Sequence, residues 1–188
     1  MFENIGSNFS LDHSVLDELK LLPELFHNYG DTFNNIPSDK TVWMTYKLSD
    51  GAISFTRNTQ IQFPKVAAAV VEYLSNIVDV PLLTERVHFI KTTGIVKPHR
   101  DEAGRNCCIN IGVLNSNSAI TKISDKDDVE TFFDDCVDYQ CQDGNAYLLN
   151  TQKLHSVIGS DVDRFLITYG FGSSFDQILS KVHYGKRF

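Results

Sequence analysis

Two histidines and one aspartate stand in a pattern that could hold a metal ion. His99 and Asp101 flank a single residue, and His155 follows far downstream. Two imidazoles and one carboxylate are the ligand set that binds non-haem Fe(II) and leaves neighbouring coordination positions open for a cosubstrate and O₂. Because side chains two apart on a strand point to the same face, His99 and Asp101 can reach one ion together, and His155 must come from another strand. The pattern predicts an iron-dependent oxygenase.

The His-x-Asp pair by itself is a weak indication, because a solvated polar loop could contain it by chance. Its surroundings favour the metal site. Apolar and β-branched runs predict short strands at 84–93, 95–96, 106–114, 146–150, 154–158 and 165–171. Arg164 opens the last of these runs, nine positions after His155, where a returning strand could direct its guanidinium at a carboxylate. The alternative partner for Arg164 is a protein acid such as Asp161 or Asp163.

The order of these residues resembles the 2-oxoglutarate/Fe(II) oxygenases, most closely their aspartyl/asparaginyl β-hydroxylase-like branch, which includes free-proline hydroxylases. The motif-bearing stretch is residues 84–172, about half of the chain. The resemblance implies that His99, Asp101 and His155 are the catalytic iron ligands and that Arg164 clamps the distal carboxylate of 2-oxoglutarate. It implies a dioxygenase that needs Fe(II), 2-oxoglutarate and O₂. Such an enzyme would hydroxylate an amino acid, a peptidyl side chain or a small metabolite, with succinate and CO₂ as co-products.

Three further residues are candidates for cosubstrate binding. The resemblance places Asn110 where the branch often has a histidine, and His88 at a strand position that faces the cosubstrate. Cys108 stands where the branch often has an arginine, which leaves the groups that hold the 1-carboxylate unassigned. Thr168 shares its strand parity with Arg164 and could donate a hydroxyl. The alternatives are an ordinary structural histidine at position 88 and a simple β-former at position 168.

The pattern of short apolar runs separated by Gly, Asn and Asp predicts a mainly β protein with flanking helices. From residue 82 onward short strands follow one another without a strand–helix–strand rhythm, which favours a double-stranded β-helix, the jelly-roll or cupin-like barrel. Upstream we expect an interrupted helix over 11–29, a hairpin of 41–48 with 52–56, and a helix over 64–78. Residues 174–181 could form a short terminal helix. We expect one domain, residues 1–188.

Composition limits the partners. The chain has 188 residues and a formal net charge of -7, which argues against binding to a nucleic-acid backbone. It contains no apolar run of membrane-spanning length, and its start lacks the pattern of a signal peptide, so we expect a cytoplasmic protein. The four cysteines do not suggest a disulfide framework, and we expect reduced thiols. The oligomeric state is not predicted.

Acidic residues are concentrated in one segment. Residues 125–143 contain eight Asp or Glu against the single Lys126. We expect a solvated loop outside the barrel core, because burying so many charges without partners is costly. The alternative is a lid beside the mouth of the site that would attract a cationic substrate.

Two other functions compete with the oxygenase. One is a cupin-type metal-dependent enzyme that works without 2-oxoglutarate. Such enzymes usually carry an early His-x-His and a following Glu, and position 101 is Asp. The other is a non-catalytic jelly-roll binding module with a vestigial site, which would have no need to keep all four polar residues.

Overall fold

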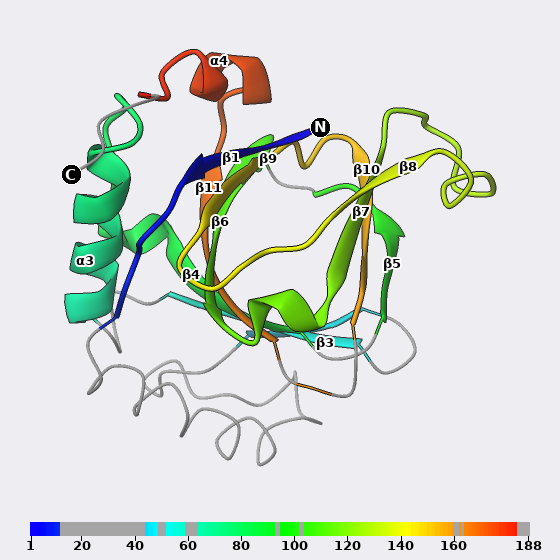
Figure 1. The fold of residues 1–188 in the computed structure, drawn as a ribbon, viewed down its shortest axis with the longest axis horizontal. Helices are drawn as coiled ribbons and strands as arrows, with labels where there is room; N and C mark the ends of the chain where they lie inside the picture. Colours follow the sequence, from blue (N-terminus) through cyan, green and yellow to red (C-terminus); the bar gives the residue numbers. More distant parts are fainter. Residues whose placement is uncertain are drawn as a thin grey trace.

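Two antiparallel sheets form in the part of the chain that the computed structural model describes, residues 1–11, 44–48, 52–58, 64–92, 95–101, 104–159, 162 and 164–183. The larger sheet has the order β1 (Phe2–Gly6), β9 (Ala146–Leu149), β6 (Cys107–Leu114), β11 (Arg164–Phe171), β4 (Val87–Thr92), β3 (Ala52–Asn58) and β2 (Met44–Leu48). The smaller sheet has the order β5 (Ile95–His99), β10 (Leu154–Ile158), β7 (Ile120–Ser124) and β8 (Cys136–Tyr139). The sheets face each other as the two walls of a barrel (Figure 1).

Alternation along the strands divides the apolar side chains between two layers. One set packs between the larger sheet and α3 (Pro64–Ser75), which lies outside the barrel (Figure 1). Helix α3 buries Val66, Val70 and Leu74, at the spacing that places them on one helical face. The other set packs between the sheets and includes Cys108, Leu166 and Ile123, so even-numbered positions of β6 and β11 face the barrel interior.

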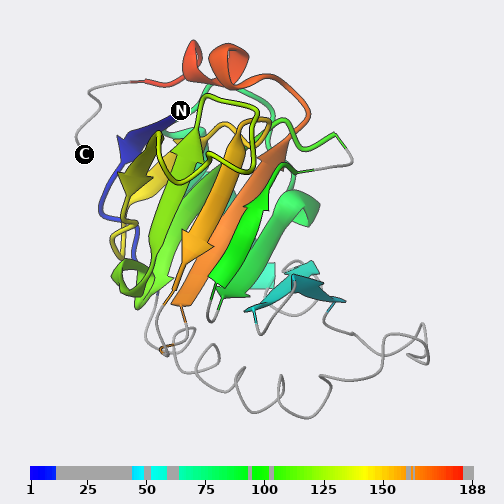
Figure 2. The same ribbon diagram turned by 90° about the vertical axis from the view of Figure 1, so that its right-hand side faces the viewer.

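This architecture confirms the predicted double-stranded β-helix with flanking helices. The expected strands around the metal motif are present, and the 52–56 strand pairs with its predicted partner as the β2–β3 hairpin. Residues 84–86 form a 3-10 turn (η1) ahead of β4, and a second such turn, η2, spans Ser116–Ser118. Helix α4 (Phe175–Leu179) begins after Ser174, whose side chain caps it, at one end of the barrel (Figures 1 and 2). The expected helix over 11–29 lies outside the described residues.

The acidic segment is not entirely a loop, and here the expectation was wrong. Residues 136–139 form β8, which pairs with β7, and the segment buries Phe132, Tyr139 and Cys141. Tyr139 and Cys141 alternate with the exposed Gln140, and these two buried side chains attach the segment to the barrel while its charges stay outside. Residues 125–130 are exposed, as expected. In Figure 1 the β7–β8 connection projects from the smaller sheet.

No helix among the described residues combines the length and the apolar character needed to cross a membrane.

Thiol reactivity tests this fold. All four cysteines are free, and Cys107, Cys108 and Cys141 are buried. Burial raises the pKa of Cys107 to about 12 and that of Cys141 to about 11, and it also raises the pKa of Cys108. Because the thiolate is the nucleophile, iodoacetamide at pH 8 should label half-buried Cys136 and spare the other three until the protein is unfolded. Peptide mass spectrometry measures this, and labelling of Cys141 as fast as Cys136 would contradict the β8 placement.

Candidate metal centre

The pairing of β5 with β10 brings the two motif histidines together. His99, the last residue of β5, lies directly opposite His155 on β10, and their ring centroids are 4.3 Å apart. The register shifts between His155 and Val157, a local irregularity beside the site. Asp101 follows β5 after one residue and points into the same space. The predicted strand placement therefore holds for His99 and His155, whereas Asp101 lies just beyond the end of β5.

The three side chains form a cluster that could hold one ion. Oδ1 of Asp101 lies 3.8 Å from Nε2 of His99 and 3.7 Å from Nε2 of His155. One donor atom from each residue lies within 4.8 Å of the others. Donors bonded to one metal at about 2.1 Å are about 3 Å apart at right angles, so each of the two Asp–His distances would have to shorten by less than 1 Å. The donor set and its size fit a divalent metal ion.

Backbone carbonyls orient both imidazoles. Nδ1 of His99 lies 2.8 Å from the carbonyl oxygen of Lys97, and Nδ1 of His155 lies 3.0 Å from that of Lys153. With the proton on Nδ1, each ring donates to its carbonyl and presents the lone pair of Nε2 to the cluster, as metal-binding histidines do. Burial, reinforced by His99, lowers the pKa of His155 to about 4. His155 is therefore neutral at pH 7, the form that binds metal.

A second polar site lies in the barrel interior around Arg164. This side chain is 1% exposed, and its Nε has no hydrogen-bond partner among the described residues. The buried hydroxyls of Tyr139 and Thr121 lie opposite each other across the β7–β8 pair and have no hydrogen-bond partner beyond each other among the described residues. Burial raises the pKa of Tyr139 to about 12, and the positive charge of Arg164 opposes this shift. The Nε of Arg164 and this pair of hydroxyls thus lie in the barrel interior. Asp161 and Asp163 lie outside the described residues.

The remaining predicted residues form one row across the larger sheet. Thr168 on β11 pairs with Asn110 on β6 and with His88 on β4. Asn110 and Thr168 are buried and share the interior face with Arg164, as the strand parity predicted. The hydroxyl of Thr168 accepts a hydrogen bond of 2.5 Å from Arg105. The structure therefore brings Asn110, Thr168 and His88 together in one row, without testing whether they bind a cosubstrate.

Sequence reasoning missed three residues of the interior. Arg105 reaches Asp101 and Thr168 from a connecting loop. Tyr139 and Thr121 lie on short strands that were not predicted individually. Thr121 could have been found from its strand-like spacing with Ile123. Tyr139 could have been found as an aromatic residue at the end of an acidic run. No periodicity marks a loop residue such as Arg105.

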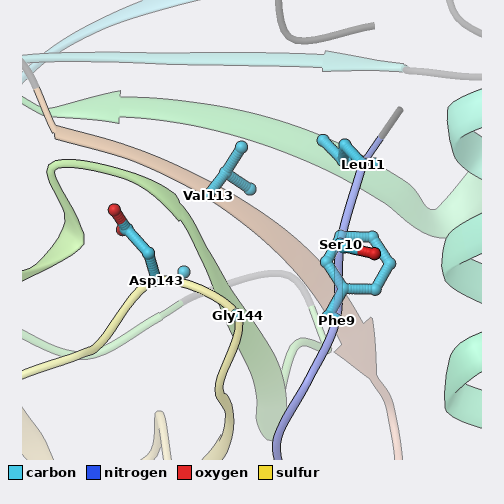
Figure 3. Close-up of a pocket in the computed structure, with 7 residues that line it drawn as sticks. Phe9, Ser10, Leu11, Val113, Asp143 and Gly144 are labelled. Carbon is cyan, nitrogen blue, oxygen red and sulfur yellow. The ribbon is translucent and has the colours of Figure 1, made fainter. Parts of the chain in front are cut away.

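A separate hollow opens on the other side of β6. It is lined by residues 9–11 on one side and by Asp143 and Gly144 on the other (Figure 3). None of its lining residues belongs to the metal cluster or to the polar site around Arg164.

Comparison with known proteins supports the fold. No family model and no curated protein matches the sequence. Among solved structures, ycfD of E. coli superposes with a TM-score of 0.51 at 13% identity, over 96% of this chain and 51% of that chain. EvdMO1 gives a TM-score of 0.49 at 17% identity, over 89% of this chain and 46% of that chain. SnoN, described as a non-heme alpha ketoglutarate dependent epimerase from nogalamycin biosynthesis, gives 0.47 at 12% identity, over 90% and 78%.

The superposition with ycfD indicates a shared fold. Another structure of the E. coli protein describes it as a ribosomal oxygenase. The chain spans about half of the length of EvdMO1 and of ycfD. At such identities the likeness concerns the barrel alone, and the chemistry has to be argued from the residues.

Metal content tests the cluster. The wild-type protein, loaded with Fe(II) without oxygen and then desalted, should retain about one ion per chain, because two imidazoles and a carboxylate converge. His99→Ala and His155→Ala should each lose most of it, and Asp101→Ala should lose less. His183→Ala is the control, because this exposed histidine lies outside the cluster. Wild-type iron retention in His99→Ala or His155→Ala would refute the assignment.

Proposed function

We propose that this protein is an Fe(II)- and 2-oxoglutarate-dependent oxygenase of the aspartyl/asparaginyl β-hydroxylase-like kind. One observation carries the proposal: the metal cluster shares a barrel interior with a buried arginine that lacks a partner for Nε among the described residues. A metal cluster alone would suit many barrel enzymes. The buried cation in the same interior calls for an anionic cosubstrate.

The surroundings of Arg164 suit one end of a dicarboxylate. A buried guanidinium is costly unless an anion accompanies it, and no carboxylate of the described residues pairs with Arg164. Its planar fork can hold both oxygens of a carboxylate at once. The buried hydroxyls of Tyr139 and Thr121, which have no partner beyond each other, could donate to the same group. We assign these three residues to the distal carboxylate of 2-oxoglutarate.

The proposed function assigns a role to each group of residues in the barrel interior. His99 and His155 would hold the ion through Nε2, and Asp101 through Oδ1. Asn110, Thr168 and His88 form the wall beside the cosubstrate. Apolar residues between the sheets exclude water from the reacting groups: Ile123, Leu149 and Leu166. When bound, Fe(II) and 2-oxoglutarate supply the activation of O₂ for oxidation of a substrate C–H bond, with succinate and CO₂ as co-products.

The substrate we propose is an amino acid, a peptidyl side chain or a small metabolite that becomes hydroxylated. The formal charge of -7 disfavours a nucleic-acid substrate. Screening amino acids and peptides for substrate-stimulated release of succinate tests this assignment.

One titration separates this function from its rivals. Adding 2-oxoglutarate to the Fe(II) protein without oxygen should produce a weak visible absorption band, since the keto acid chelates the iron. A cupin-type enzyme that works without 2-oxoglutarate would bind iron and show no band. A non-catalytic module would retain no stoichiometric iron.

Arg164 provides the sharpest test of the cosubstrate. Hydrogen bonds to charged groups contribute about 1.5–3 kcal/mol each, so Arg164→Ala should raise the apparent KM for 2-oxoglutarate about tenfold or more. Iron retention should stay near the wild-type value, because Arg164 is not a ligand. Arg164→Lys should recover part of the loss, since an ammonium cannot reproduce the fork. Tyr139→Phe, which removes one hydroxyl, should give a smaller increase.

An unchanged dependence on 2-oxoglutarate in Arg164→Ala would refute the clamp. It would favour a metal-dependent barrel enzyme that uses no keto acid.

A further inference from the structure

Arg105 extends from the β5–β6 connection into the barrel beside the metal cluster. Its Nε lies 3.3 Å from Oδ2 of Asp101, and its Nη2 donates to the hydroxyl of Thr168 at 2.5 Å. The stem of the side chain lies over Gly170 on β11, where an added Cβ would come within 3.3 Å of the Cγ of Arg105. The guanidinium is thus held between the loop that carries one candidate ligand and the wall of the larger sheet.

The two oxygens of Asp101 face different partners. Oδ1 points to Nε2 of both histidines, at 3.8 and 3.7 Å, whereas Oδ2 points to Arg105. A carboxylate can bind a metal ion through one oxygen or through both. With Oδ2 paired to a cation, only Oδ1 is available to the ion.

Backbone contacts keep Arg105 in this place. The amide of Asp101 donates to the carbonyl of Thr151 at 3.0 Å, and the hydroxyl of Thr151 donates to the carbonyl of Arg105 at 2.6 Å. The side-chain amide of Gln152 donates to the carbonyls of both Asp101 and Arg105, at 3.3 and 3.2 Å. The 101–105 loop is therefore fastened to the turn that leads into His155, at both of its ends.

We propose that Arg105 is a positioning residue that acts through Asp101. By holding Oδ2, it makes Asp101 a one-oxygen ligand and so preserves the open coordination positions that the proposed oxygenase needs. This inference rests on the metal site of the proposed function. Arg105, a loop residue, would thereby influence how tightly the site binds its ion and how many protein atoms coordinate it.

The test is metal binding, with Mn(II) as the probe for affinity and Co(II) as the probe for geometry. Loss of a residue that orients a ligand typically weakens metal affinity about 10- to 100-fold, and we expect this for Arg105→Gln. The visible spectrum of the Co(II) protein should change as well, because its bands follow the number and arrangement of donor atoms. Arg105→Lys should restore part of both, since an ammonium can reach Oδ2 but cannot also hold Thr168.

Arg100 offers a matched control. It lies between His99 and Asp101 in sequence, yet its guanidinium turns away to the carbonyl of Gln152 and the carboxylate of Asp127. Arg100→Gln removes the same charge next to two ligands and should leave Mn(II) affinity and the Co(II) spectrum unchanged. An equal loss in Arg100→Gln and Arg105→Gln would overturn the positioning role, because charge alone would then explain both.

Thr168→Val keeps the test decisive should Arg105→Gln fail to fold. It removes one of the anchors of the guanidinium and keeps the side-chain size, so Mn(II) affinity should fall about twofold to tenfold. Wild-type affinity and spectrum in folded Arg105→Gln, or in Thr168→Val if that is the variant that folds, would overturn the inference. A rise in the dissociation constant for 2-oxoglutarate with unchanged metal binding would do so too. If the wild-type protein binds neither metal, the metal site itself fails, which is a different result.

Discussion

The register between β5 and β10 is the constraint on which the candidate site depends. His99 and His155 meet because they are partners in one antiparallel pair. Side chains alternate with a period of two, so a slip of one residue would turn one imidazole to the outside of the barrel. Apolar packing helps to fix this register, because the same slip of β5 would expose Val96, which is 5% exposed. Packing and metal geometry are thus determined by the same pairing.

The interior of the barrel departs from an ordinary apolar core in a consistent way. The Nε of Arg164 has no hydrogen-bond partner among the described residues, and the buried hydroxyls of Thr121 and Tyr139 have none beyond each other, all on strands that border the space between the sheets. Each such atom lowers the stability of the empty protein, since its hydration is lost without replacement. Native proteins retain few of these atoms, and their concentration here indicates a space shaped for polar occupants. An entirely structural barrel would be more stable with apolar residues at these positions.

The sequence predicted the parts of this arrangement that follow from periodicity. Strand parity placed Arg164 and Thr168 on one face, and the run after residue 82 indicated a barrel instead of a parallel sheet. It could not predict Arg105, because a loop side chain acquires its direction from hydrogen bonds to Thr151 and Gln152, which lie far away in sequence. Charge density concealed β8, since exposed acids outnumber the buried Tyr139 and Cys141 within the same segment. Whether Asn110 and His88 touch a cosubstrate depends on a ligand, which no pattern of residues specifies.

Both imidazoles take their orientation from carbonyl oxygens of the main chain, those of Lys97 and Lys153. Every amino acid carries such an oxygen, so the side chains at these two positions can drift without disturbing the histidines. Lys153 also pairs with Asp125 in the acidic segment, at 3.4 Å. A substitution of Lys153 would alter the charge next to the acidic segment, while the tautomer and direction of His155 stayed the same. At position 153 the side chain can therefore change while the main-chain contact that orients His155 is kept. A lineage could change what approaches this barrel without rebuilding what reacts inside it.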